Sequence, residues 1–193
     1  MHKKLKKYIE SYLVIDSSEL ENNSIELIPN GGMTLLINLG LDFEIINNEK
    51  KYPIKQGQTV LLNAYENSIF LNHYKESNLI LIRFKGAGAS FFFQEVLDIL
   101  ENDIIVFNEP LIKETKDIIP LLDDYFINKF KPSTLPFNIM KIINLIEESQ
   151  GDYNIDDVLA LANTPRRIFD KIFRREVGLS LKTYAHIIKK KTS

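Results

Sequence analysis

The chain has 193 residues, a formal net charge of −2 and 45% hydrophobic residues, which suits one large or two small globular domains. It contains no cysteine, which excludes disulfides and thiolate metal sites, and only three histidines. No stretch approaches the roughly 18 apolar residues of a transmembrane helix, and the basic start lacks the apolar core of a signal peptide. We therefore expect a cytoplasmic protein that does not contact a membrane.

Residues 8–85 have the pattern of antiparallel β structure. Turn formers such as PNGG at 29–32, NN at 47–48 and KQGQ at 55–58 separate short apolar or alternating runs at roughly ten-residue spacing. The seven runs are SYLVID, SIELI, MTLLINLG, DFEII, TVLLNAY, SIFLNHY and NLILIRFK. They predict a sandwich or small barrel, with LILIRF covered on both faces because it alternates little.

The period changes at GAGAS, residues 86–90. These glycines predict a backbone bend rather than a phosphate cradle, since no Gly-Lys-Ser/Thr follows. Apolar residues at helical spacing then predict helices from Ala89 to Leu100 and from Leu111 to Phe130, with Pro120 kinking or dividing the second. DIIVF between them suggests an edge strand.

The segment KPSTLP at 131–136 has the composition of a linker. It separates a β-rich domain, residues 1–130, from an all-α unit, residues 137–193, and the chain is predicted to be α+β.

Two helices are predicted at the start of the C-terminal unit. The first, Asn138 to Glu148, carries isoleucines on one side, and the second starts near Asn154, a good N-cap. After it, Asn163 can adopt the left-handed conformation that ends a helix, and Thr164 is expected to cap the next one.

The third helix, Pro165 to Val177, has the most informative spacing. A buried stripe of Ile168, Phe169, Ile172 and Phe173 would turn its charged residues outward. Gly178 should end it, and Ser180 should cap a fourth helix that reaches about Lys191. Two helices joined by a three-residue turn, the second with a basic face, follow the helix-turn-helix plan of DNA-binding proteins.

Charge is concentrated in this region, because residues 165–193 hold nine Lys and Arg residues but only Asp170 and Glu176 as acids. Such asymmetry indicates a polyanion partner, namely double-stranded DNA, although a solvated basic helix or a structural helical hairpin has the same pattern. The candidate DNA-binding residues are Arg166, Arg167, Asp170, Lys171, Arg174 and Arg175.

The segment IDDVLALANTPRRIFDKIFRREVGLSLKTYAHIIK resembles the first helix-turn-helix of the AraC/XylS family of bacterial transcription regulators. The resemblance rests on Arg167, Phe169, Phe173, Gly178, Ser180 and Tyr184. LIPNGG and LINLG similarly resemble the cupin-like sensor domain of one branch of that family. Pro165 departs from the family pattern, which has a capping serine there, and Leu159 and Leu181 replace a usual alanine and proline.

The resemblance implies a cupin-like sensor domain followed by only the first of the family's two helix-turn-helix units, so that the unit would be truncated. It implies, together with helix geometry, that Arg167 and Lys171 read bases, with Asp170 as a third reader. Arg166, Arg174 and Arg175 would contact phosphates. The helix from Leu111 to Phe130 would be a dimer surface, or else would pack on its own barrel.

An enzyme is not expected, and neither is a cofactor, a metal site or a catalytic residue. Only His73 lies in the β region, and no Gly-x-Ser-x-Gly elbow or cysteine nucleophile is present. A small-molecule effector could occupy the barrel, with Asn63, Tyr65, Asn72 and Tyr74 near it, or the barrel could be filled by its own side chains. The alternative function is a truncated ligand-binding or dimerisation module that modulates a full-length regulator.

Overall fold

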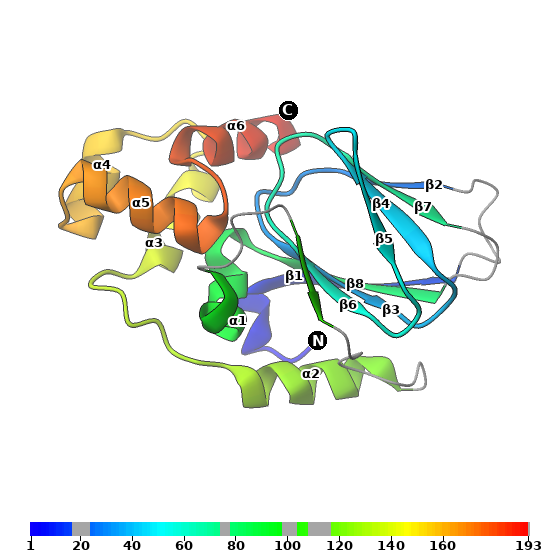
Figure 1. Cartoon of the computed structure of the whole chain (residues 1–193). Coiled ribbons are helices and arrows are strands. Elements are labelled where there is room, and N and C mark those ends of the chain that lie inside the picture. Colours follow the sequence, from blue (N-terminus) through cyan, green and yellow to red (C-terminus); the bar gives the residue numbers. More distant parts are fainter. Residues whose placement is uncertain (17–23, 74–77, 98–103, 108–116, 193) are drawn as a thin grey trace.

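The N-terminal half forms a sandwich of two antiparallel β-sheets, as the sequence pattern predicts (Figure 1). The computed structural model describes residues 1–16, 24–73, 78–97, 104–107 and 117–192. One sheet contains, in spatial order, β1 (Ile9–Asp16), β8 (Asn78–Phe84), β3 (Thr34–Asn38), β6 (Thr59–Leu62) and β9 (Ile104–Phe107). The other contains β2 (Ser24–Leu27), β7 (Ile69–His73), β4 (Phe43–Asn47) and β5 (Lys50–Ile54).

Strand β8 is covered on both faces, which confirms the prediction for LILIRF. It pairs with β1 on one side and with β3 on the other. Leu79 and Leu81 face the second sheet, whereas Ile80 and Ile82 face the helices. The expected edge strand DIIVF is also present as β9, which pairs only with β6 among the described strands.

Strand β5 is absent from the seven predicted runs. It forms a hairpin with β4 across the predicted Asn-Asn turn, where Asn48 and Glu49 have positive φ values of 46° and 68°. Its sequence KKYPI contains two lysines and a proline, residue types that are uncommon in strands, so the sequence pattern does not predict it. Proline is tolerated because β5 lies at the edge of its sheet.

The helices that precede the linker, one of them before β1, cover the five-stranded sheet and one end of the sandwich. They are η1 (Leu5–Lys7), η3 (Gly86–Ala89), α1 (Ser90–Leu97) and α2 (Ile118–Lys129). Figure 1 shows α2 running beneath the sheet. Pro120 lies in the first turn of α2, so it neither kinks nor divides the described helix, because a first-turn proline leaves no intrahelical hydrogen bond unmade. Leu100 and the start of the second predicted helix lie outside the described residues.

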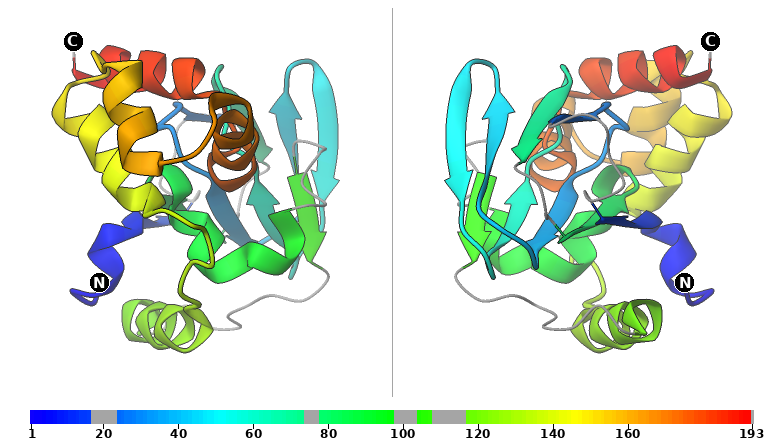
Figure 2. Two further views of the ribbon diagram at one scale, coloured as in Figure 1. Left: turned by 90° about the vertical axis from the view of Figure 1, so that its left-hand side faces the viewer. Right: turned by 90° about the vertical axis from the view of Figure 1, so that its right-hand side faces the viewer.

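The C-terminal half is a group of helices at one end of the sandwich (Figures 1 and 2). They are α3 (Ile139–Glu148), α4 (Ile155–Ala162), α5 (Arg166–Val177) and α6 (Leu181–Thr192). Residues 130–138, which include the predicted linker, contain no helix or strand. None of the described helices is long and apolar enough to cross a membrane.

Two hydrophobic clusters hold this α+β fold together. One lies between the sheets, where Leu36, Phe43 and Leu81 are among its members. The other joins the outer face of the five-stranded sheet to the helices of both halves, from Phe84 and Phe92 to the residues of α3, α5 and α6. The two halves therefore share one continuous core.

Candidate nucleic-acid interface

The local sequence sets the positions of α4 and α5. Asn154 begins α4 by accepting a hydrogen bond from the Asp156 backbone N–H at 2.9 Å, and Asn163 ends it in the left-handed conformation with φ 44°. Helix α5 begins after Pro165 and ends at Gly178, whose φ of 88° suits a residue without a side chain. The expected two helices and three-residue turn are thus formed.

One expected cap is wrong. Thr164 does not cap α5, because its hydroxyl donates instead to the Ala162 carbonyl at 2.8 Å, and the N-cap position falls on Pro165. The cap of α6 is formed as predicted, with Ser180 Oγ accepting from the Thr183 N–H at 3.1 Å.

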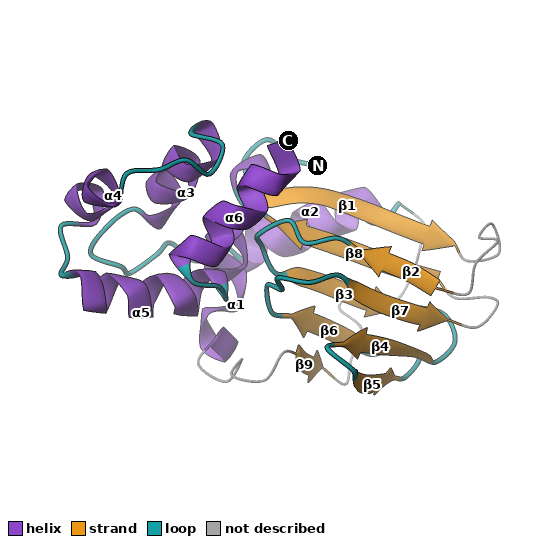
Figure 3. Ribbon diagram, turned by 90° about the horizontal axis from the view of Figure 1, so that it is seen from above, coloured by secondary structure: helices purple, strands orange, loops and turns teal. Residues whose placement is uncertain are grey.

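The structure brings five of the six candidate residues to one exposed surface of α5. These five are Arg166, Arg167, Asp170, Lys171 and Arg174. Arg166 Nε lies 3.9 Å from Asp170 Oδ2, and both side chains are more than half exposed, so this pair restrains them only weakly. In the view from above, α5 lies on the side of the helical group opposite to α3 (Figure 3). We call these five residues the basic face of α5.

Arg175 differs from the other five. Its Nη1 lies 2.5 Å from Oε1 of Glu176, whose side chain is only 1% exposed, and Arg175 itself is half-buried. A buried carboxylate requires such a partner, because leaving it unpaired costs several kcal/mol. Arg175 therefore supports the fold at the edge of the basic face.

Ile168 also departs from the prediction. The spacing predicts it in the buried stripe, but it is 52% exposed, whereas Phe169 and Phe173 are fully buried. The residues facing the core follow i, i+4 and i+8 steps at Phe169, Phe173 and Val177, and this turns the face away from Ile168.

The underside of α5 is fixed by an aromatic stack. The ring of Phe169 lies 5.8 Å from Phe137 and 5.7 Å from Phe173, and Phe173 lies 5.9 Å from Tyr184 of α6. At the end of α5, Gly178 lies so close to the sandwich that an added Cβ would be 2.0 Å from Asn63 Oδ1. The basic face is therefore held in one orientation relative to the sandwich.

Helix α6 is attached to the sandwich through Tyr184. Its ring packs on Gly31, and its hydroxyl donates to Glu147 Oε1 of α3 at 3.0 Å. Burial, together with the nearby Glu147 carboxylate, raises the pKa of Tyr184 well above its ordinary value of 10.0. The hydroxyl thus stays protonated and keeps donating.

A second attachment of α6 is electrostatic. Glu10 of β1 forms an ion pair with Lys191 and accepts from Asn30 Nδ2 at 2.6 Å, and Arg83 Nε lies 3.9 Å away. Burial alone would raise the pKa of Glu10. The hydrogen bonds from Lys191 and Asn30 and the charges of Lys191 and Arg83 outweigh it and hold this pKa below the ordinary value of 4.5.

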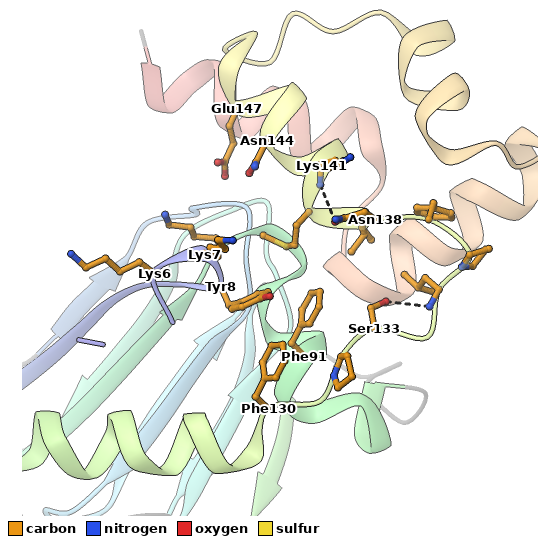
Figure 4. A pocket seen from close by; sticks show the side chains of 17 residues that line it. Lys6, Lys7, Tyr8, Phe91, Phe130, Ser133, Asn138, Lys141, Asn144 and Glu147 are labelled. Atoms are coloured by element: carbon orange, nitrogen blue, oxygen red, sulfur yellow. Dashed lines mark hydrogen bonds between the residues drawn. The ribbon is translucent and has the colours of Figure 1, made fainter. Parts of the chain in front are cut away.

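A groove of about 870 Å³ opens between the sandwich and α3. Figure 4 shows Lys6, Lys7 and Tyr8 of the N-terminal segment on one side of it and Asn144 and Glu147 of α3 on the other. These lining residues were not predicted. The basic N-terminal run was visible in the sequence, but nothing in it indicated that α3 would lie opposite.

The sandwich interior is occupied by its own side chains. Tyr65 is 7% exposed and belongs to the cluster between the sheets. Asn63 and Tyr65 line a smaller hollow of about 170 Å³ on the loop after β6, and Asn72 is half-buried in β7. Tyr74 lies outside the described residues. Among the described residues no group of three or more acidic or histidine side chains could hold a metal ion.

No protein-family model matches the chain, and no curated protein matches it in sequence. Its fold is similar to that of solved structures of ToxT from Vibrio cholerae. The structure of an apo ToxT variant aligns with a TM-score of 0.55 and 12% identity over 94% of this chain and 80% of ToxT. A second, of wild-type ToxT with a bound unsaturated fatty acid, aligns with a TM-score of 0.50 and 15% identity over 94% and 79%. The likeness extends through the cupin-like sandwich and the helices and establishes the fold.

Proposed function

We propose that the chain is a DNA-binding transcriptional regulator of the AraC type. The observation that carries this proposal is the basic face of α5, which is exposed on the second of two helices joined by a three-residue turn and is held from beneath by the aromatic stack. The likeness in fold to ToxT, a regulator of this type, supports it, as does the sequence resemblance around α5. Such a regulator acts in the cytoplasm and has no catalytic role.

In this proposal α5 enters the major groove of double-stranded DNA. Arg167 and Lys171 read bases, with Asp170 as a third reader, and Arg166 and Arg174 contact phosphates. Arg175 lies at the edge of the contact, where it is already paired with Glu176. In this proposal α4 and α5 form one helix-turn-helix, the first of the family's pair, and affinity is weak at physiological salt unless a second unit binds alongside.

The test is fluorescence anisotropy with a pool of random double-stranded 20-mers, followed by sequencing of the bound fraction. Arg167→Ala should relax the selected sequence, because a bidentate base contact is worth about 1–3 kcal/mol of discrimination. Arg174→Ala should weaken binding to all sequences alike and reduce the salt slope by about one. Lys51→Ala, on the exposed surface of β5, is the matched control and should change neither. Equal binding by all four proteins at low salt contradicts the proposal.

The proposal includes a small-molecule effector. One ToxT structure contains a bound fatty acid, and in the present chain a groove lies between the sandwich and α3. Effector binding at a junction of the two halves would change how stably the C-terminal helices, including α5, are docked on the sandwich.

Pairing of two chains through α2 is a second candidate function, either in a homodimer or as a module that binds a full-length regulator. Helix α2 exposes Ile119, Leu121 and Ile127 as well as packing on its own sheet through Leu122 and Phe126. Exposed apolar side chains on one helix favour an interface. Sedimentation equilibrium of the chain with and without Ile119→Asp/Ile127→Asp tests this: a dimer lost in the variant supports it, and a monomer in both opposes it.

A further inference from the structure

Ile168 is an apolar side chain on the otherwise charged outer side of α5. It is 52% exposed, and among the residues of α5, all of which the structure describes, it is the one large apolar side chain with such exposure. Phe169 and Phe173 fill the underside of the helix and are fully buried. The core therefore does not require an isoleucine at position 168.

The place of Ile168 on the surface follows from the geometry of the helix. Arg167 and Lys171, the proposed base readers, are four residues apart and form a row along the outer side of α5. Ile168 lies beside this row, because it directly follows Arg167 and precedes Lys171 by three residues. Asp170 and Arg174 lie along the opposite side of the same row. The exposed surface of α5 thus has one charged edge and one apolar edge.

Ile168 also lies near the beginning of α5, where it is the third residue of the helix. In a helix-turn-helix, the N-terminal residues of the second helix are the ones that contact base edges in the major groove. In the arrangement proposed for α5, Ile168 therefore reaches the bases together with Arg167.

The charged side chains of α5 leave the methyl group of thymine unread. In the major groove, Arg and Lys bond to the O6 and N7 acceptors of guanine, and Asp accepts from the N4 amino group of cytosine. Thymine presents a C5-methyl group there, which offers an apolar contact and no hydrogen bond. An apolar side chain beside Arg167 and Lys171 is suited to that contact.

We propose that Ile168 recognises thymine through its C5-methyl group in the major groove. This rests on the proposed function, since it requires α5 to enter that groove, and it adds a base that the charged readers do not select. The contact removes apolar surface of both partners from water, which is favourable. Isoleucine is branched at Cβ and has few χ1 rotamers, so little side-chain entropy is lost when the contact forms.

The experiment compares two forms of the duplex that the wild-type chain selects from the random pool, one with thymine and one with deoxyuridine at every thymine position. Deoxyuridine pairs with adenine as thymine does and lacks only the methyl group. In fluorescence anisotropy, the wild type should bind the thymine form about three- to fourfold more tightly for each methyl group that Ile168 contacts. Ile168→Ala should bind both forms equally. Ile28→Ala, which truncates a 63% exposed isoleucine after β2, is the matched control and should keep the wild-type preference.

Equal affinities of the wild type for the two forms would overturn the assignment of Ile168, as would a selected site without thymine. An undiminished preference in Ile168→Ala would overturn it as well, because another residue would then read the methyl group. Each of these results comes from a chain that binds DNA, so the proposed function would stand. A wild-type chain that binds no duplex would instead contradict both proposals.

Discussion

Ile143 of α3 provides a direct test of whether the two halves unfold as one unit. Its side chain is fully buried against Gly86 of η3, where an added Cβ would lie 2.8 Å from Ile143 Cδ1. Ile143→Val removes this methyl group from the contact between the C-terminal helices and the sandwich. Core Ile→Val changes cost about 0.5–1.5 kcal/mol. The equilibrium constant for unfolding should therefore rise about 2- to 13-fold.

Hydrogen exchange measured by mass spectrometry shows which amides lose protection when the stability falls. Because one hydrophobic cluster contains residues of both halves, amides of β3 and β8 should lose protection by the same factor as amides of α3 and α5. Ile168→Val is the matched control, since Ile168 is 52% exposed and the change should stay within about 0.5 kcal/mol. Loss of protection confined to α3–α6, with the strands unchanged, would refute the reasoning and indicate two independent units.

Three further predictions concern the attachments and caps of the helices. Gly31→Ala should lower the free energy of unfolding by at least about 1–2 kcal/mol in chemical denaturation, because φ is +85° there and the new Cβ would lie 2.6 Å from Tyr184 Cε2. Asn154→Ala should cost about 1 kcal/mol and reduce helical circular dichroism, since it removes the side-chain cap of α4. Glu10→Gln should cost about 0.5–1 kcal/mol at pH 7 by weakening the pair with Lys191. Because the pKa of Glu10 is lowered in the fold, its contribution is present above about pH 4.5 and is lost as the pH falls further, so wild type and variant should converge in acid denaturation.

The sequence predicted most elements because their signals are local. Helix caps at Asn154 and Ser180, the left-handed Asn163 and the apolar spacing of α3 depend on residues within one or two turns. The class of fold followed from these signals and from the strand pattern. Errors arose where a residue satisfied two patterns: Ile168 fits a stripe with Phe169, but the step of four residues through Phe173 sets the buried face.

The contacts between the halves were not predictable from periodicity. The packing of Tyr184 on Gly31 and the pair of Glu10 with Lys191 join residues more than 150 positions apart. The half-burial of Arg175 has a similar origin, since it depends on a carboxylate that the fold buries next to it. The five residues of the basic face of α5 could be predicted together, because which side of a helix is exposed follows from local spacing. The groove could not be predicted, because it depends on where α3 lies relative to the N-terminal segment.

Helix α3, which lines the groove, and helix α5, which carries the basic face, lie on different sides of the helical group (Figures 2 and 3). If the proposed functions hold, a ligand in the groove and a duplex on α5 would contact different helices. Any influence between them would then be allosteric, and the aromatic stack beneath α5 offers one packed route for it. Thermodynamic reciprocity adds a constraint: the ligand changes the affinity for DNA by the same factor by which DNA changes the affinity for the ligand.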